Sequence, residues 1–253
     1  MIKTAPKTAL VTGAAKRIGR AIALRLARDG YDIGVHYGRS RDDALALVAE
    51  LEALGVRAAA VQADLAEVAT VTRLIDDARA ALGPVSVLIN NASVFADDRA
   101  RNLTLDSWRL HMDTNLLTPV LLSQAFAAQA DLPRPASIIN LIDQRVLKPS
   151  PPFFSYGLSK AGLWHATRTL AQALAPAIRV NAIGPGPTLK SIHQSEQDFA
   201  REARATLLQK PTSPEEVAEA AVFLLNAPSV TGQMICVDSG QHLTWKTVDM
   251  LDL

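Results

Sequence analysis

The sequence T-G-A-A-K-R-I-G at residues 12–19 decides how the rest of the chain is expected to fold. Before it, residues 8–12 form a short apolar run typical of a buried strand, and after it residues 18–29 carry apolar side chains at helical spacing. Gly13 permits a tight turn between the two elements, and Gly19 allows the helix to approach the strand closely. The N–H groups at such a helix start can seat a pyrophosphate, so we expect a dinucleotide-binding turn rather than a plain one.

Strands and helices alternate outward from this turn along the whole chain. Short apolar runs predict further strands at residues 32–36, 58–62, 85–90, 137–141, 179–183 and 233–237. Longer amphipathic stretches predict helices at residues 42–54, 67–82, 104–129, 155–175 and 215–226, with a break near Thr118-Pro119. This alternation is typical of parallel βαβ units. We therefore expect an α/β fold: one domain over residues 1–253, with a Rossmann-type doubly wound parallel sheet of about seven strands and helices on both faces.

Composition narrows the class of protein. The 253 residues are 49% hydrophobic and 20% charged, which suffices for one domain with a sizeable core. The net charge of +1 gives no indication of a nucleic-acid or membrane partner. The single cysteine, Cys236, lies in the apolar run M-I-C-V, so we expect a core residue and no intramolecular disulfide. The five histidines are dispersed without metal-ligand spacing, so no metal is expected. Without a signal peptide or a membrane-spanning run, we expect a cytoplasmic protein.

Two segments interrupt the alternation. A long polar connection follows the sixth predicted strand, and residues 187–212 lie where a lid over a cleft is expected. The tail, residues 241–253, carries several large apolar side chains, among them Leu243 and Trp245. An apolar tail of this kind indicates an interface rather than a catalytic site.

The sequence S-Y-G-L-S-K-A-G at residues 155–162 carries the strongest indication of chemistry. Tyr156 and Lys160 stand four residues apart, which places both side chains on one face of a helix. A free phenol has a pKa of about 10, and a neighbouring ammonium group stabilises the phenolate. We therefore expect Lys160 to lower the pKa of Tyr156 and make it a proton donor for a carbonyl or an imine. The alternative is a pair of solvated side chains.

The end of the second predicted strand indicates which dinucleotide is bound. Folds that bind NAD usually place an acid there for the ribose 2′-hydroxyl, but residues 35–40 read V-H-Y-G-R-S, with no carboxylate before Asp42. Arg39 and Ser40 can instead hold a 2′-phosphate, assisted by Arg17. The alternative is that Arg39 only solvates a loop. We expect NADPH rather than NADH.

These motifs together resemble the short-chain dehydrogenase/reductase family over nearly the whole chain. The matching pieces are T-G-A-A-K-R-I-G, Asp64-Leu65, N-N-A-S at 90–93, Asn115 in D-T-N-L, Tyr156 with Lys160, G-P-G at 184–186 and V-D-S-G at 237–240. The resemblance implies a nicotinamide cofactor, hydride transfer to a carbonyl or an imine, and a homo-oligomer that is commonly a tetramer. It also implies that Asn115 holds a water in a proton relay and that Lys160 holds the nicotinamide ribose.

The turn, the strand ends and the resemblance together give the residues expected around the cofactor. They are Gly13, Lys16, Arg17, Ile18, Gly19, His36, Tyr37, Arg39, Ser40, Asp64, Leu65, Asn91, Ala92, Ser93, Tyr156, Lys160, Pro185 and Gly186. The catalytic residues expected are Asp143, Tyr156, Lys160 and Asn115.

One departure from the family pattern is informative. The family usually has a catalytic serine ahead of the tyrosine, but here the fifth strand ends in N-L-I-D and places Asp143 there. Ser137 lies at the other end of that strand, away from the chemistry. An aspartate at this position, with H-Y-G-R-S and N-N-A-S-V-F, is similar to the pteridine reductase subgroup. The subgroup implies that Phe95 stacks on a pterin and that Ser93 contacts both pterin and cofactor. The substrate-binding residues expected are Arg17, Ser93, Phe95, Asp143 and Tyr156.

The sequence leaves three functions open. The first is NADPH-dependent reduction of a C=N bond in a dihydropterin or dihydrofolate, with a proton relay through Tyr156, Lys160 and Asp143. The second is reduction of a ketone or a 3-oxoacyl thioester, although a carboxylate is a poor partner for a developing oxyanion unless it is protonated. The third is a nucleotide-sensing regulatory protein that has kept the fold and lost catalysis.

Overall fold

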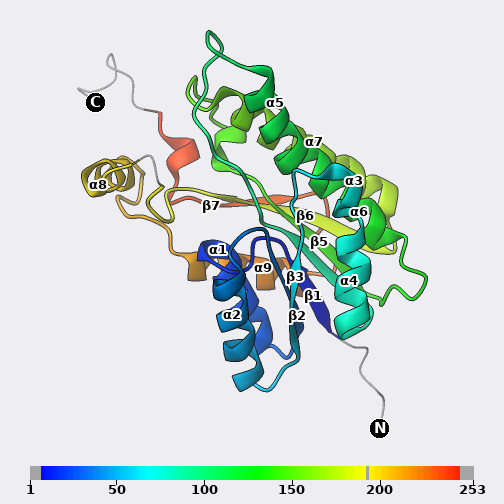
Figure 1. The fold of residues 1–253 in the computed structure, drawn as a ribbon. Helices are drawn as coiled ribbons and strands as arrows, with labels where there is room; N and C mark the ends of the chain where they lie inside the picture. Colours follow the sequence, from blue (N-terminus) through cyan, green and yellow to red (C-terminus); the bar gives the residue numbers. More distant parts are fainter. Residues whose placement is uncertain (1–6, 192–193, 246–253) are drawn as a thin grey trace.

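A single parallel sheet forms the centre of the computed structural model, which describes residues 7–191 and 194–245 (Figure 1). Its seven strands run in the order β3-β2-β1-β4-β5-β6-β7, and every neighbouring pair is parallel. The strands are β1 (Thr8–Val11), β2 (Asp32–Tyr37), β3 (Ala58–Gln62), β4 (Val87–Asn90), β5 (Ala136–Leu141), β6 (Ile178–Pro185) and β7 (Met234–Val237). The predicted Rossmann-type doubly wound fold is confirmed.

Helices cover both faces of the sheet (Figure 1). One face packs against α1 (Arg17–Arg28), α2 (Arg41–Ala53) and α9 (Pro214–Asn226). The other face packs against α4 (Arg73–Leu82), α6 (Thr118–Ala127) and α7 (Phe154–Leu174). The strand side chains alternate between the two layers: in β1, Val11 belongs to the first core and Leu10 to the second. Burial on both faces explains why these strands read as continuous apolar runs.

The strand order reverses between β1 and β4. Successive strands are added outward from β1 to β2 and β3 on one side of the sheet, and then from β4 to β5, β6 and β7 on the other side. The connections that leave the carboxyl ends of β1 and β4 therefore diverge, and a crevice opens between them. This crevice is where ligands bind in open α/β sheets.

Two predicted helices are interrupted in the structure. The helix expected at residues 67–82 is divided into α3 (Val68–Val71) and α4. The helix expected at residues 104–129 consists of α5 (Leu105–Met112), a π-helical turn η1 (Asp113–Leu117) and α6. Pro119 is the second residue of α6, which continues directly from the π-helical turn, and without an N–H it cannot donate a helical hydrogen bond there. The break is therefore the π-helical turn just before the proline.

The polar connection after β6 contains a helix that the sequence analysis did not predict. This helix, α8 (Glu196–Arg204), begins with a capping box in which Ser195 and Asp198 exchange side-chain and backbone hydrogen bonds. The chain then returns through α9 and β7 to the short turn η3 (Gln241–Leu243). Leu243 and Trp245 are more than half exposed, and the rest of the predicted tail lies outside the described residues. Among the described helices, none has both the length and the apolar character needed to cross a bilayer.

Candidate active site

Tyr156 and Lys160 lie one turn apart on α7, as their spacing predicts. Both are buried, with 6% and 2% of their surface exposed, and Lys160 Nζ lies 5.7 Å from the centre of the Tyr156 ring. Nζ donates a hydrogen bond to the carbonyl oxygen of Leu141 at 2.8 Å. Burial lowers the pKa of Lys160 to about 8, and the negative charge of Asp143 opposes this shift. The lysine is thus anchored at the carboxyl end of β5 and remains cationic at neutral pH.

Asp143 lies directly against the phenol. It precedes the short helix η2 (Gln144–Val146) as its N-cap, and its Oδ1 accepts the backbone N–H of Arg145 at 2.8 Å. Its other oxygen, Oδ2, accepts the hydroxyl of Tyr156 at 2.8 Å. The capping hydrogen bond fixes the orientation of the carboxyl group. Asp143, between the end of β5 and the start of η2, is thereby held beside the phenol of Tyr156.

The electrostatics of this pair differ from the sequence expectation. Burial raises the pKa of Asp143, and the charge of Arg145 is the largest influence that opposes it. The pKa of Tyr156 is raised well above its ordinary value of 10, first by burial and then by the charge of Asp143. The expectation that Lys160 lowers the pKa of Tyr156 is therefore wrong for this arrangement, because burial and the charge of Asp143 both raise it. The phenol and the carboxyl group share a hydrogen bond along which a proton can pass.

The buried side chain of His36 supports the turn at residues 12–19. Gly13 has a φ of +62°, and its N–H donates to Nδ1 of His36 at 3.0 Å. The second ring nitrogen, Nε2, lies 3.1 Å from the carbonyl oxygen of Ala63, so the imidazole is neutral with its proton on Nε2. Burial lowers the pKa of His36 to about 4, which keeps it neutral. With 2% of its surface exposed, His36 supports the turn through its hydrogen bond with Gly13.

The start of α1 fits the phosphate groups of a dinucleotide. A Cβ at Gly19 would stand 2.4 Å from the oxygen of Gly13 and 2.6 Å from Nδ2 of Asn91, so only glycine lets the helix begin this close to the turn. The N-cap, Lys16, makes no capping hydrogen bond with its side chain, which pairs instead with Asp43 at 2.8 Å. The first N–H groups of α1 therefore lack a side-chain partner at the cap and suit an anion.

The side chain of Arg17 contacts the segment that follows β6, and its expected part in binding a 2′-phosphate stays a prediction. It has a φ of +55°, and its two terminal nitrogens donate to the carbonyl oxygens of Leu189 and Lys190, each at 3.0 Å. Arg17 and Ile18 both line the cleft that contains Tyr156. This position agrees with the expected substrate-side role of Arg17.

Asn115 is fully engaged with protein groups. Its Oδ1 accepts the N–H of Val94 at 2.8 Å and the hydroxyl of Ser93 at 3.1 Å. Its Nδ2 donates to the carbonyl oxygen of Val94 and to the hydroxyl of Ser159. The side chain thus ties the segment after β4 to α7, and the expected part of Asn115 in holding a water stays a prediction.

The remaining cofactor residues divide between two parts of the sheet edge. Asn91 Nδ2 donates to the carbonyl oxygens of Thr12 and Gly13, so Asn91 holds the turn. A separate group stands at the carboxyl ends of β2 and β3, outside the cleft of Tyr156, and consists of Tyr37, Arg39, Ser40, Asp64 and Leu65. Arg39 and Asp64 are exposed, whereas Leu65 is buried in the core. This second group suits the far end of a long cofactor.

A cleft lies over the carboxyl ends of β1, β4, β5 and β6, and Tyr156 and Asp143 are among its lining residues. It has a volume of about 460 Å³ and adjoins a hollow of about 190 Å³ that reaches Asn91 and Lys160. The lining residues common to both are Arg17, Ile18, Ser93, Asp143, Tyr156, Pro185, Gly186, Thr188 and Leu189. The structure therefore brings Asp143, Tyr156 and Lys160 and the expected substrate residues to the cleft and its adjoining hollow. Asn115, the fourth expected catalytic residue, is not among the lining residues, whereas Leu189, from the segment after β6, is.

The sequence analysis missed several residues of this cleft. The ring of Phe95 stacks on Phe153, with the ring centres 4.0 Å apart and the planes 18° from parallel. Arg145, Phe199 and Glu202 also line the cleft. For Arg145 and Phe153 the usable signal is position, because they lie two residues after Asp143 and three before Tyr156. Phe199 and Glu202 belong to the unpredicted α8, so no such signal exists.

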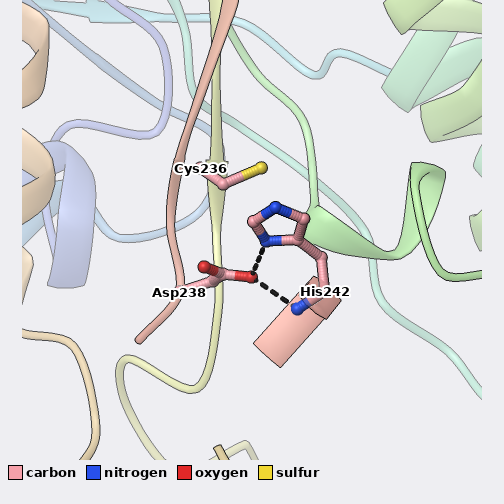
Figure 2. A group of neighbouring side chains, drawn as sticks. All are labelled: Cys236, Asp238 and His242. Atoms are coloured by element: carbon pink, nitrogen blue, oxygen red, sulfur yellow. Dashed lines mark hydrogen bonds and ion pairs between the residues drawn. The ribbon is translucent and has the colours of Figure 1, made fainter. Parts of the chain in front are cut away.

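Cys236, Asp238 and His242 form a second cluster of polar side chains, beside the C-terminal turn (Figure 2). Their ligand atoms lie within 4.8 Å of one another. Asp238 Oδ2, however, accepts the backbone N–H of His242 and contacts Nδ1 of its ring at 2.7 Å, while Oδ1 accepts the N–H of Gly240. Cys236 is half-buried, not a core residue as predicted, and burial raises the pKa of its thiol to about 11. The cluster closes the turn.

The chain is similar to known oxidoreductases over most of its length. A family described as Enoyl-(Acyl carrier protein) reductase matches residues 13–242. The 3-oxoacyl-(acyl-carrier-protein) reductase FabG of Staphylococcus epidermidis is 34% identical over 242 residues, which cover 94% of this chain and 99% of that protein.

Two solved structures are also similar. FolM Alternative dihydrofolate reductase 1 from Brucella suis, in complex with NADP, is 43% identical with a TM-score of 0.93, and the match covers 99% of this chain and 100% of that one. The protein of the same description from Brucella canis, complexed with NADP, is 42% identical with a TM-score of 0.91, over 97% and 98% of the two chains.

Proposed function

The chain belongs to the short-chain dehydrogenase/reductase family, and on that basis we propose that it reduces a ring C=N bond of a dihydropterin or a dihydrofolate with NADPH. The observation that carries the proposal is the hydrogen bond from Tyr156 to Asp143 at 2.8 Å. A carboxyl group stands where the family pattern has a neutral hydroxyl. A pterin presents ring nitrogens and an amino group, and these suit a carboxyl group that can either donate or accept.

The cofactor is NADPH, and the residues present fit it. The N–H groups at the start of α1 suit the pyrophosphate, and Lys160 at the end of β5 suits the nicotinamide ribose. Arg39 and Ser40, at the exposed end of β2, are proposed to take the 2′-phosphate. When bound, NADPH supplies the hydride.

The protein's own residues supply the proton. When a ring carbon gains a hydride, the adjacent nitrogen must gain a proton. The hydroxyl of Tyr156 gives its proton to that nitrogen when Asp143 is protonated. The hydrogen bond between the two side chains then reverses, and the carboxyl group passes its proton to the phenol oxygen. Because burial raises the pKa of Asp143, its carboxyl group holds a proton at a higher pH than a solvated aspartate would. Lys160 contributes a positive charge next to the phenol ring.

A second candidate is reduction of a 3-oxoacyl thioester or another ketone. The similarity to the FabG reductase, at 34% identity, favours it. Asp143 can serve an oxyanion only in its protonated form, which its raised pKa makes more accessible. The third alternative, a regulatory protein without catalysis, is not retained, because Asp143, Tyr156 and Lys160 remain assembled at one cleft.

A substrate screen tests the proposal. The oxidation of NADPH is followed by absorbance with dihydrobiopterin, dihydromonapterin, dihydrofolate, a small diketone and a 3-oxoacyl thioester, each over a range of concentrations. We expect the highest kcat/KM for a pterin or folate. A higher kcat/KM for the thioester or the diketone would reject the pterin assignment in favour of the second candidate.

Location and assembly are proposals as well. We propose a cytoplasmic homotetramer with a small-molecule substrate and no nucleic-acid or membrane partner. The exposed apolar side chains of Leu105 in α5 and of Leu243 and Trp245 near the C-terminus support an interface between subunits. Light scattering of the purified protein would give the mass directly, and a monomer would contradict this assignment.

A further inference from the structure

Arg145 occupies a specific place in the cleft. It lies in η2, and its backbone N–H donates to Oδ1 of the N-cap residue Asp143, so its position is fixed relative to the catalytic carboxyl group. Its guanidinium carbon lies 5.7 Å from the ring centre of Phe95 and 5.5 Å from that of Phe153. Both distances are in the range of a cation–π contact. The aromatic pair therefore supports the guanidinium group at the cleft.

The guanidinium group has hydrogen-bonding capacity left over. Its Nη1 is buried and has no hydrogen-bond partner among the described residues, and within the same residues Arg145 makes no ion pair. Buried donors of this kind are normally satisfied, so the exception needs an explanation. A ligand that brings an acceptor into the cleft would provide one.

The other charged side chains of the cleft already have partners. Arg17 donates to two lid carbonyl oxygens. Glu202 accepts the side-chain amides of Gln194 and Gln241. Asp143 accepts the hydroxyl of Tyr156 and one backbone N–H. Arg145 differs from all three, since its side chain has no comparable polar partner in the described structure.

The stacked rings of Phe95 and Phe153 require a strained backbone at Phe153. Phe153 has a φ of +57°, in the left-handed region that bulky residues rarely occupy. In this conformation its ring stacks on Phe95, which in turn meets Tyr156 edge to face at 4.7 Å. Strain of this kind is concentrated at functional sites, where the surrounding structure maintains it. The strained backbone thus helps to keep two rings beneath one guanidinium group.

We propose that Arg145 binds the substrate by donating hydrogen bonds to one of its oxygen acceptors, either a ring carbonyl or a carboxylate. The inference rests on the proposed function, because it takes the substrate to be a flat pterin or folate ring that lies beside Phe95. Arg145 and Asp143 then offer opposite polarities from one short helix: the guanidinium donates, and the carboxyl group serves the nitrogens of the ring. This pairing selects a planar ring that carries both donors and acceptors.

The test compares two substitutions at Arg145 with a matched control. Arg145→Met keeps an unbranched side chain but removes the charge and the donors, whereas Arg145→Lys keeps the charge without the planar fork. Arg168→Met is the control, because Arg168 also lies over an aromatic ring, that of Trp164 at 5.0 Å, but is exposed on α7 outside the cleft. The measurements are KM and kcat for dihydrobiopterin and dihydrofolate at saturating NADPH.

We expect Arg145→Met to raise KM about tenfold or more, as befits the loss of a charge-assisted hydrogen bond. Arg145→Lys should recover part of the loss, and Arg168→Met should behave as wild type. A rise in KM with both substrates assigns the ring carbonyl, which both contain. A rise with dihydrofolate alone assigns a carboxylate, which dihydrobiopterin lacks.

A pH profile gives a second readout. Because the charge of Arg145 opposes the rise in the pKa of Asp143, its removal should shift the alkaline limb of kcat to higher pH. If wild type reduces both substrates and neither Arg145 variant changes KM, this inference is wrong and the proposed function stands. If wild type reduces neither substrate, the proposed function fails and takes this inference with it. Should Arg145→Met fail to fold, Arg145→Gln also removes the charge with a polar side chain, and an unchanged KM in that variant would reject the inference.

Discussion

The hydroxyl of Tyr156 donates its hydrogen bond to Oδ2 of Asp143, at 2.8 Å, from a helix to a strand end thirteen residues earlier. Both groups have raised pKa values, and burial is the first cause for each. Two acids that share one hydrogen bond in a cleft form a coupled pair, so their titration belongs to the pair rather than to either residue.

Replacement of Asp143 should separate the two enzyme readings. Asp143→Ser restores the usual family arrangement for ketones, and Asp143→Asn keeps the shape but cannot titrate. We expect both variants to reduce dihydropterins at roughly one hundredth of the wild-type rate or less, as for loss of an acid–base group. The rate of NADPH oxidation is measured with a dihydropterin and with a small diketone. If Asp143→Ser reduces pterins as fast as wild type, the aspartate is incidental.

Replacement of Tyr156 by Phe removes the hydroxyl and keeps the ring. We expect NADPH binding to remain nearly intact and turnover to fall roughly 10²-fold or more, because the proton donor is gone. Binding is measured by the change in NADPH fluorescence, and turnover by its oxidation. Lys160→Ala serves for comparison and should impair both quantities. Wild-type turnover in Tyr156→Phe would exclude the tyrosine as the donor.

Arg39 should determine the preference for NADPH over NADH. Its side chain is exposed at the end of β2, where no acid is present to hold a ribose hydroxyl. Arg39→Ala removes a charge-assisted contact worth about 1.5–3 kcal/mol, so KM for NADPH should rise about tenfold or more while KM for NADH changes little. Arg41→Ala, at the first position of α2, provides a neighbouring control of equal charge. An unchanged ratio of the two KM values in Arg39→Ala would place the 2′-phosphate elsewhere.

His36 should make folding sensitive to acid. Its pKa falls from an ordinary 6.5 to about 4 in the folded protein, so the unfolded chain binds a proton first as the pH decreases. The free energy of unfolding should therefore decline between pH 6.5 and 4, by on the order of 3 kcal/mol from this residue, and show no such contribution above pH 7. Urea unfolding at several pH values measures it. His36→Gln should flatten the decline relative to wild type, and His165→Gln, at an exposed position on α7, should not.

The sequence was sufficient for the fold because the patterns there are local. Apolar runs of four to six residues, such as those that became β1 and β5, are buried on both faces and leave little choice of secondary structure. The exceptions have a tertiary cause. The π-helical turn at Asp113–Leu117 places Asn115 where it bonds to Val94 and Ser159, and those contacts are tertiary. No pattern within residues 104–129 contains them.

The site was harder to predict because its energetics depend on distance in space. The spacing of Tyr156 and Lys160 correctly placed both on one helix, but it could not show that the phenol is buried and hydrogen-bonded to the carboxyl group of Asp143. In the same way, motif reasoning named Phe95 and not Phe153, whose stacking partner lies 4.0 Å away but far along the chain.

The contact of Arg17 with the lid has a consequence for the kinetic order of the reaction. Arg17 belongs to the turn that suits the pyrophosphate, and its side chain donates to the carbonyl oxygens of Leu189 and Lys190 in the segment after β6. Arg17 and Leu189 both line the cleft. A shift of this turn when the nucleotide binds should therefore also move the segment that lines the substrate cleft. The nucleotide should be the first molecule to arrive and the last to leave. Product-inhibition patterns would then be competitive between the two nucleotide forms and noncompetitive between NADP and the pterin.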